Sequence, residues 1–515
     1  MMKHITQRAG LGAALALGAL PAQAQGIDET INRVFADYTG WYVGLIFADL
    51  PGTNFSWIAL WLVVAALIFT FYFGFIQLKG FAHSIRLVKG DYSDPDDAGE
   101  VSHFQALTTA LSGTVGLGNI AGVAVAVGIG GPGATFWMVM AGLFGMATKF
   151  TECTLGVKYR NEYPDGTVSG GPMYYITKGF KERGYPGGSF LAVLFCIFTI
   201  LGALGGGNMF QANQAHAQIA NVVGDYPGWI TGIILAVVTF TVIVGGLQSI
   251  ARVTEKVVPF MGIFYVLVSL LILVMNADQI LWAFGRIFEG AFTGLGVMGG
   301  FTGALIQGFR RAAFSNEAGI GSAAIAHSAV RTKEPVTEGY VALLEPFIDT
   351  VVICTMTALV IVITGVLNVD AETGLYIWNA EAGRISTDGE VAGVALTSAA
   401  YARAFSWFPV LLAIAVVLFA FSTMISWSYY GLKAWTYLFG EGKTKETVFK
   451  VIFCLFIVIG SAANLGPVID FSDAMLFSMA VVNVIALYLL MPIVKREVNS
   501  YVTRLRAGEI KRFKS

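Results

Sequence analysis

The sequence predicts an all-α polytopic membrane protein of about 11 transmembrane helices, built as a 5+5 inverted repeat after one extra N-terminal helix. The 515-residue chain is 56% hydrophobic and only 13% charged, whereas soluble domains carry about 25% charged residues. Apolar runs long enough to cross about 30 Å of hydrocarbon recur from end to end. Two of these runs are interrupted by glycine and polar residues, which indicates broken membrane helices.

The N-terminus has the pattern of a secretory signal peptide over residues 1–26. Lys3 and Arg8 are basic, residues 11–20 are apolar, and Ala22-Gln23-Ala24 fits a cleavage site. A short uncleaved anchor is the alternative. Residues 27–56 are mixed and amphipathic, and we expect them on the outer surface.

Residues 57–78 are predicted as the extra transmembrane helix, 104–275 as the first five-helix repeat and 297–493 as the second. Within the repeats we expect spans at 104–128, 133–156, 190–222, 228–247, 256–275, 297–328, 340–367, 407–436, 448–466 and 470–493. Residues 277–295 are amphipathic, with Trp282 and Phe288 among their apolar side chains. This segment is expected to be an external interfacial helix rather than a span.

Lysine and arginine predict the orientation, because they concentrate in cytoplasmic loops. They gather on one side of the predicted spans and in the basic tail 494–515, while the other side carries Arg33, Arg286, Arg384 and Arg403. We therefore expect a multi-pass protein of the cytoplasmic (inner) membrane, with the mature N-terminus outside and the C-terminus in the cytoplasm.

The first interrupted run reads SGTVGLGNIAG over residues 112–122. Glycine costs about 1 kcal/mol relative to alanine inside a helix, and freed backbone groups cannot face lipid. We interpret the run as an unwound binding segment. Its N–H groups would meet an anion such as an α-carboxylate at Gly116, Leu117 and Gly118. Its oxygens would meet a cation at Ser112, Thr114, Val115 and Asn119. The alternative is that the glycines only permit tight helix packing.

The second interrupted run reads FSNEAGIGSA over residues 314–323. Residues 115–119 and 318–322 are faintly similar, and the two runs start on opposite sides of the membrane. This arrangement is typical of inverted-repeat transporters. Ser315, Asn316 and Glu317 are costly in a membrane unless they are satisfied. Arg310 and Arg311 either pair with an acid such as Glu317 in an outer vestibule or lie at the membrane surface.

Two further spans offer polar side chains. The fourth span carries three amide side chains at intervals of three residues, which places them near one side of the helix: Asn208, Gln211 and Gln214. Amides there can bind both ends of a zwitterion or form interhelical hydrogen bonds. In the ninth span, Ser422, Thr423 and Ser426 precede Trp427. Their hydroxyls suit a small hard cation, or they bond back to the preceding helical turn.

Other polar residues are interpreted as structural. Lys149 and Glu152 are spaced to pair on one helix, and His216 and His327 have no metal-ligating partner at suitable sequence spacing. The four cysteines lie in apolar segments without metal or redox spacing. No nucleophile–base set or phosphate-binding loop occurs, so we expect neither an enzyme nor a cofactor, and no nucleic-acid partner.

The sequence is similar to the alanine or glycine:cation symporter family from about residue 57 to 495. The resemblance rests on GLGNIAGVA at 116–124, GGPG at 130–133, GGPMYY at 170–175, FSNEAGIGSA at 314–323 and EPFIDT at 345–350. It implies Na⁺-coupled, in some members H⁺-coupled, uptake of small neutral amino acids by a leucine-transporter-like fold.

The resemblance also implies residue roles. The Thr114 carbonyl and Asn119 would bind the cation nearest the substrate. A second sodium site would use Ser112, Val115, Ala420 and Thr423. The wider pattern has another hydroxyl after Thr423, where this chain has Met424, so Ser422 or Ser426 substitutes or the coordination is looser. The pocket would be lined by Gln211, Phe314, Ser315, Asn316 and Trp427, with Phe314 and Trp427 capping a cavity for a side chain about as large as a methyl.

The expectation is therefore a monomeric sodium-coupled importer of alanine or glycine that works by alternating access in the lipid bilayer. Three alternatives stay open: a proton-coupled symporter, one that prefers glutamine or serine, and a channel or receptor that uses the same pocket without coupling.

Overall fold

The computed structural model of the protein describes residues 39–53, 55–164, 166–293, 300–369, 376–378 and 393–513. The predicted signal segment 1–26, residues 27–38 of the amphipathic segment, Arg33 and Arg384 lie outside the described residues. The described part of the amphipathic segment packs onto the membrane helices. The Tyr42 and Ser478 hydroxyls are 2.7 Å apart, and the Phe47 ring lies 3.9 Å from the Arg310 guanidinium carbon.

The extra helix is bent. α2 (Trp57–Tyr72) and α3 (Ile76–Val88) meet at 76°. Between them, Gly74 has a φ of 61° and Phe75 a φ of 59°, a left-handed conformation that interrupts the helix and that glycine adopts at little cost. The chain therefore turns after Tyr72 rather than continuing straight through the span predicted at 57–78.

The first half of the fold follows α3. The first broken helix consists of α4 (His103–Thr114), the π-helical turn η1 (Gly118–Gly122) and α5 (Val123–Gly130), bent by 50°. Next come α6 (Gly133–Lys158), the antiparallel strands β1 (Asn161–Glu162) and β2 (Val168–Ser169), and α7 (Pro172–Arg183). The half ends with α8 (Gly188–Leu204), η2 (Gly205–Met209), α9 (Phe210–Val223), α10 (Gly228–Ile243) and α11 (Gly246–Met275).

The second half begins with η3 (Ala277–Gln279) and α12 (Ile280–Thr293). The second broken helix comprises α13 (Gly300–Asn316) and α14 (Ala323–His327). It is followed by α15 (Pro335–Ala342), α16 (Leu344–Pro346), η4 (Phe347–Cys354) and α17 (Thr355–Ile363). The antiparallel strands β3 (Leu367–Val369) and β4 (Tyr376–Trp378) precede α18 (Val394–Ala404), α19 (Phe408–Phe439), α20 (Lys443–Ala462) and α21 (Leu465–Arg506). α7 and α18 lie outside the predicted spans.

Among the described residues, five helices are long and apolar enough to cross a membrane, and up to seven spans result if each bent pair counts as one. The chain is thus a mostly helical, multi-pass membrane protein. The count of eleven helices and the inverted repeat stay predictions.

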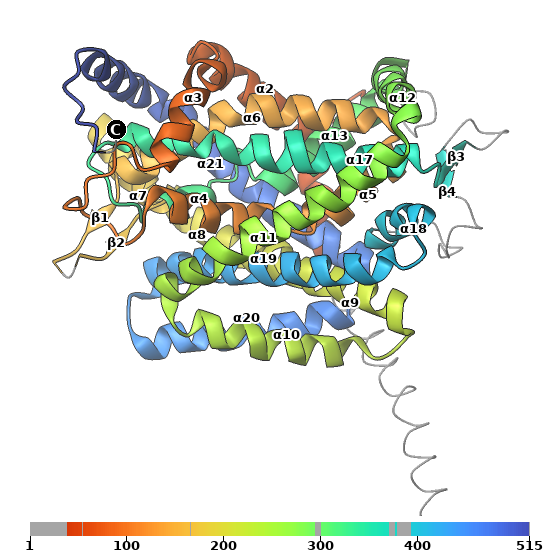
Figure 1. Cartoon of the computed structure of the whole chain (residues 1–515). Helices are drawn as coiled ribbons and strands as arrows, with labels where there is room; N and C mark the ends of the chain where they lie inside the picture. The colour runs from red at the N-terminus through yellow and green to blue at the C-terminus, as the bar shows by residue number, and fades with distance from the viewer. Residues whose placement is uncertain are drawn as a thin grey trace, which may run out of the picture.

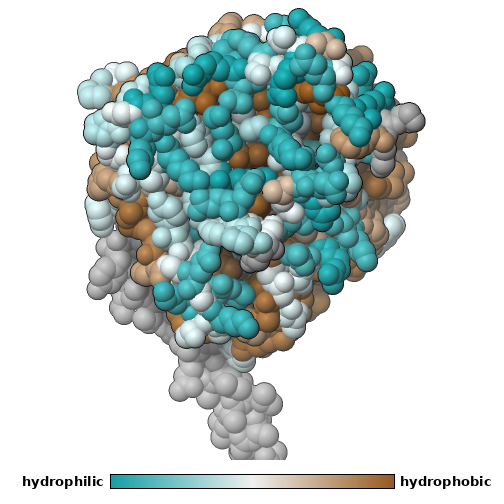
Figure 2. Space-filling view, turned by 90° about the vertical axis from the view of Figure 1, so that its left-hand side faces the viewer, coloured by the Kyte–Doolittle hydropathy of each residue, from teal (hydrophilic) through white to brown (hydrophobic). Residues whose placement is uncertain are grey.

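The long helices run side by side across the molecule (Figure 1). The end that carries the C-terminus, β1, β2 and α7 presents mainly hydrophilic residues (Figure 2). Ion pairs fasten this end, among them Lys158–Glu497 at 2.7 Å and Arg504–Glu334 at 2.6 Å. At the opposite end, α12 buries Ala283 and Ile287 and leaves Leu281 and Phe288 exposed, as expected for an amphipathic helix.

The two broken helices lie among the packed helices of the core. α13 packs against α5 and α6, α14 packs against α4 and α6, and α19 packs against α4, α8 and α9. The first broken helix begins with a capping box, in which the Ser102 hydroxyl accepts the Gln105 N–H and the Gln105 side chain accepts the Ser102 N–H. Packing of α4, α13 and α19 brings together the polar residues of three distant sequence segments.

Candidate functional site

The first break lies over residues 115–117, between α4 and η1. The Gly116 N–H donates to the Asn119 side-chain oxygen at 2.9 Å, and the Leu117 N–H donates to Gln211 Oε1 at 3.1 Å. Gln211 is held in turn by its own amide, which donates to the Gly206 carbonyl at 2.9 Å. Two of the three backbone N–H groups that we expected to meet a carboxylate, those of Gly116 and Leu117, therefore donate to side-chain oxygens at the break.

The second break lies between Asn316 and Ala323. Glu317 has a φ of 56°, and Gly319 and Gly321 have φ values of 90°. Asn316 bridges the break, because its side-chain oxygen accepts the Ala318 N–H at 3.0 Å and its amide donates to the Thr350 hydroxyl at 2.8 Å. A positive φ in a non-glycine residue such as Glu317 is uncommon and costs energy.

The two breaks are in direct contact. An added Cβ at Gly118 would lie 3.2 Å from the Ser315 Cα, so a glycine at this position permits the close approach of the two backbones.

A buried carboxylate joins the two breaks. Asp349, in η4, is fully buried. One of its oxygens accepts from the Asn119 amide at 2.6 Å, and the other accepts from the Ser315 and Thr350 hydroxyls at 2.8 and 2.7 Å. The neighbouring buried bases pair elsewhere in the described structure, Lys149 with Glu345 and Arg311 with Asp473. Buried carboxylates without a basic partner favour a bound cation.

Asp349 was missed as a site residue, although the block EPFIDT at 345–350 contains it. The available signal was an aspartate inside a predicted span, which is costly unless it binds something.

Polar contacts join the end of α4 to α19. The Ser112 hydroxyl donates to the Ser422 carbonyl at 2.6 Å, and the Thr423 hydroxyl donates to the Ser112 carbonyl at 3.1 Å. An added Cβ at Gly116 would overlap the Thr423 hydroxyl. Val115 and Ala420 are buried on the same two segments. The structure therefore places the oxygens expected for a second cation site on two adjoining elements.

The two candidate substitutes for the missing hydroxyl are engaged differently. The Ser422 hydroxyl donates back to the Phe419 carbonyl of its own helix at 2.9 Å, and the Ser426 hydroxyl donates to the Thr109 carbonyl of α4 at 3.0 Å. The Thr114 hydroxyl also bonds back within its helix, to the Ala110 carbonyl at 3.2 Å, while the Thr114 carbonyl accepts the Gly116 N–H at 2.8 Å.

Two aromatic rings close the site on the side of α8 and η2. The Trp427 indole N–H donates to a Glu317 carboxylate oxygen at 2.9 Å. Gly207 lies so close to the Trp427 ring that any Cβ there would overlap it. The Phe314 ring packs edge-on against Phe210, with centroids 5.0 Å apart. Trp427, Gln211 and Phe314 are only 2%, 3% and 6% exposed, so the site is closed to solvent.

The amides of the fourth span divide between the two expected roles. Asn208 donates to the Phe453 carbonyl of α20 at 2.6 Å, and Gln214 accepts from the Val394 N–H at 2.8 Å. These two form interhelical hydrogen bonds. Gln211 alone of the three reaches the first break.

The partners suggested for two sets of buried charges are wrong. Arg310 and Arg311 both pair with Asp473 of α21 rather than with Glu317, and Arg311 is buried rather than at the surface. Lys149 pairs with Glu345 at 3.2 Å, whereas Glu152 accepts from Asn483 at 2.8 Å.

The fold also brings potential metal ligands to His327 that sequence spacing did not predict, since Cys153 and Glu345 lie beside it. All of these pairings join residues from different segments.

A family model and several relatives match most of this chain. The model of the sodium:alanine symporter family matches residues 46–515. The sodium/alanine symporter AgcS of Methanococcus maripaludis is 38% identical over 471 residues, which cover 90% of this chain and 99% of AgcS.

Two Bacillus subtilis proteins are also similar. The putative sodium/proton-dependent alanine carrier protein YrbD is 36% identical and the alignment covers 81% of this chain and 83% of YrbD. The probable sodium/glutamine symporter GlnT is 32% identical and the alignment covers 86% of this chain and 87% of GlnT.

Among solved structures, MhsT in complex with L-phenylalanine has the same leucine-transporter-like fold. It superposes with a TM-score of 0.51 at 15% sequence identity, covering 76% of this chain and 89% of MhsT.

Proposed function

This chain belongs to the sodium:alanine symporter family, and we propose that it imports alanine or glycine together with sodium across the cytoplasmic membrane by alternating access. Membership makes the chain a multi-pass transporter that performs cation-coupled amino-acid symport rather than an enzyme. The choice of sodium and of alanine or glycine is the proposal, as is the orientation with the N-terminus outside and the C-terminal tail in the cytoplasm.

The observation that carries the proposal is the contact of Asp349 with both broken helices. The carboxylate lies against Asn119 of the first helix and Ser315 of the second. Carboxylate, amide, hydroxyl and carbonyl oxygens are the ligands that a hard cation prefers. Sodium bound here would neutralise a buried charge and hold the two breaks together. The Thr114 carbonyl is the further oxygen assigned to this cation.

The second sodium is assigned to the contact between α4 and α19. Its ligands are the carbonyls of Ser112, Val115 and Ala420 and the hydroxyl of Thr423, with Ser422 contributing through its packing against Ser112. A cation at this position would fix the two helices in one relative arrangement. Its departure would allow them to separate.

The substrate is assigned to the first break. Its carboxylate would accept the N–H groups of residues 116–118, at the position where Gln211 Oε1 accepts the Leu117 N–H. Ser315 and Asn316 supply polar groups from the second break. Phe314 and Trp427 close the pocket, and their tight packing against the glycines of η2 favours a side chain no larger than a methyl.

Coupling follows from the adjacency of these ligands. The sodium near Asp349 and the substrate carboxylate would attract each other across a dry site, so each raises the affinity of the other by the same factor. A monomer as the transporting unit stays a prediction.

Uptake of labelled alanine into proteoliposomes tests the proposal. With an inward sodium gradient, alanine should accumulate above its external concentration, and replacing sodium by choline should abolish the accumulation. Equal accumulation in choline would leave protons as the coupling ion. Equilibration without accumulation would identify a channel. A competition panel of glycine, serine and glutamine would then define the substrate, since the relatives include both an alanine and a probable glutamine symporter.

A further inference from the structure

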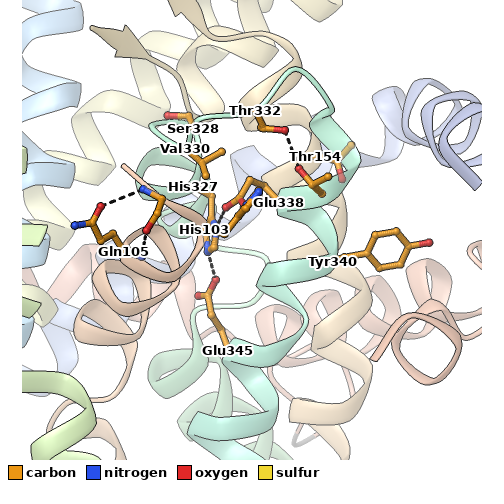
Figure 3. Close-up of polar contacts among 12 residues, drawn as sticks. His103, Gln105, Thr154, His327, Ser328, Val330, Thr332, Glu338, Tyr340 and Glu345 are labelled. Carbon is orange, nitrogen blue, oxygen red and sulfur yellow. Dashed lines mark hydrogen bonds and ion pairs between the residues drawn. The ribbon is translucent and has the colours of Figure 1, made fainter. Parts of the chain in front are cut away.

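A second polar cluster lies between the two broken helices and the polar end of the molecule. Glu338 of α15 contacts His103 of α4 with one oxygen and His327 of α14 with the other. The second ring nitrogen of His327 is 2.6 Å from Glu345, whose other oxygen lies 3.2 Å from the Lys149 ammonium. Figure 3 shows the two histidines close to Glu338, with Glu345 below them.

The contacts of His327 require a proton. A neutral imidazole has one N–H and one bare nitrogen. Both ring nitrogens of His327 contact carboxylate oxygens. At least one exchangeable proton must therefore be present beyond those of a neutral histidine and two carboxylates. It lies either on the ring or on Glu338 or Glu345.

The charge balance of the surroundings leads to the same conclusion. The groups that face this cluster are buried and come from α4, α6, α7, α14, α15, α16, α19 and the second break. The acids are Glu152, Glu317, Glu338 and Glu345, the bases are Lys149, His103 and His327, and the weak acids are Cys153, Tyr175 and Tyr430. Even with both histidines charged, the glutamates outnumber the bases, and net charge is expensive in a buried site.

The cluster connects the substrate site to the polar end. Glu317, which accepts the Trp427 indole N–H, also accepts the Ser322 hydroxyl just before α14. His327 ends α14. At the other end of the cluster, His103 is the first residue of α4 and follows the exposed Ser102. Separation of α4 from α14 and α15 would break the contact between His103 and Glu338 and admit water to His327.

We propose that Glu338, His327 and Glu345 form a proton-binding site that releases its proton to water at the polar end when α4 separates from α14 and α15 during transport. This inference rests on the proposed transport function. On release, the bond that holds the extra proton breaks, either N–H on His327 or O–H on Glu338 or Glu345. The electron pair stays on that nitrogen or oxygen, and the proton passes to water. The positive charge of Lys149 then compensates the negative charge of Glu345. When the helices close again, the site rebinds a proton.

A metal ion fits this cluster less well. Cys153, His327 and Glu345 offer ligand atoms within 4.8 Å of one another. Both nitrogens of His327 already contact carboxylates, so a metal could bind the ring only by displacing Glu338 or Glu345. A proton satisfies the same contacts without any rearrangement.

The test measures proton release directly. Purified protein with sodium and alanine bound is mixed rapidly with a sodium-free choline medium in lightly buffered detergent with a pH indicator, because loss of sodium removes the ion that holds the two broken helices together. We expect release of up to about one proton per chain, since one dissociable proton satisfies His327. His327→Gln and Glu338→Gln should abolish the release while sodium-dependent alanine binding persists. His216→Gln, a partly buried histidine outside the cluster that contacts Thr231, should behave like the natural protein.

Each outcome decides between explanations. Intact sodium-dependent alanine binding without proton release would overturn this inference alone, as would unchanged release in a folded His327→Gln or Glu338→Gln protein. Absence of alanine binding by the natural protein would instead overturn the proposed function. Glu338→Gln keeps the shape of the side chain, with one hydrogen-bond acceptor and one donor group, so it remains informative if His327→Gln fails to fold.

Discussion

Asn119 and Asp349 lie 230 residues apart in the sequence, yet the Asn119 amide donates to both the carboxylate and the backbone carbonyl of Asp349, at 2.6 and 3.0 Å. Asn119 also accepts the Gly116 N–H at 2.9 Å. One side chain thus links the conformation of the first break to the carboxylate that contacts the second. Any ligand that alters the contact between Asn119 and Asp349 will therefore affect the conformation of both breaks.

Asp349→Asn should abolish or strongly weaken sodium dependence. The variant keeps the size of the side chain but removes the charge that favours a cation. The measurement is the sodium concentration that half-saturates alanine uptake, which should rise by at least tenfold, equivalent to about 1.4 kcal/mol. Asp278→Asn, on the exposed turn before α12, is the matched control. An unchanged sodium titration for Asp349→Asn would remove this residue from the cation site.

Thr423→Ala should weaken sodium binding at the contact between α4 and α19. The change removes a hydroxyl oxygen assigned to sodium. The same hydroxyl donates to the Ser112 carbonyl at 3.1 Å, a bond that contributes only about 1 kcal/mol to stability. We expect a several-fold rise in the half-saturating sodium concentration with little change in thermal stability. Thr423→Ser, which retains the hydroxyl, should restore normal values. If serine and alanine behave alike, the hydroxyl is not a ligand.

Gly207→Ala should impair transport by displacing Trp427. The added methyl would overlap the indole ring, and overpacking a closed core costs about 1–3 kcal/mol. The Michaelis constant for alanine should rise because the indole would lose its position beside Glu317. Gly262→Ala, in α11, adds a methyl where nothing lies within 4 Å and should leave uptake unchanged. Normal alanine uptake by Gly207→Ala would show that the ring has room to move.

Asp473→Asn should destabilise the protein. Asp473 is fully buried and pairs with Arg310 at 2.9 Å and with Arg311. Removing one partner of a buried ion pair costs about 3–5 kcal/mol, because the remaining charge is left without compensation. A fluorescence-monitored thermal melt in detergent should show a lower unfolding temperature. If the melting temperature equals that of the exposed-site variant Asp278→Asn, the pairing does not contribute to stability.

Much of the local structure could be predicted from the sequence, because helix length, amphipathicity and helix breaks depend on residues close in the chain. The glycine and polar residues after Thr114 and Asn316 indicated two breaks, and α4 and α13 end at these residues. The amphipathic pattern around Trp282 indicated a helix with one exposed apolar face, which α12 has. The family resemblance, carried by local motifs, is confirmed by the match over residues 46–515.

Only the tertiary structure decided which polar groups meet. Lys149 had an acid, Glu152, at ideal spacing on its own helix, yet it pairs with Glu345 of α16. Arg311 pairs with Asp473 rather than the nearby Glu317, and His327 lies between Glu338 and Glu345. Sequence determined where the helices form and break, because those choices are made by backbone and neighbouring side chains. The partners of each buried charge were decided by the packing of segments up to hundreds of residues apart, since a charge removed from water must find its counterpart wherever the fold brings one close.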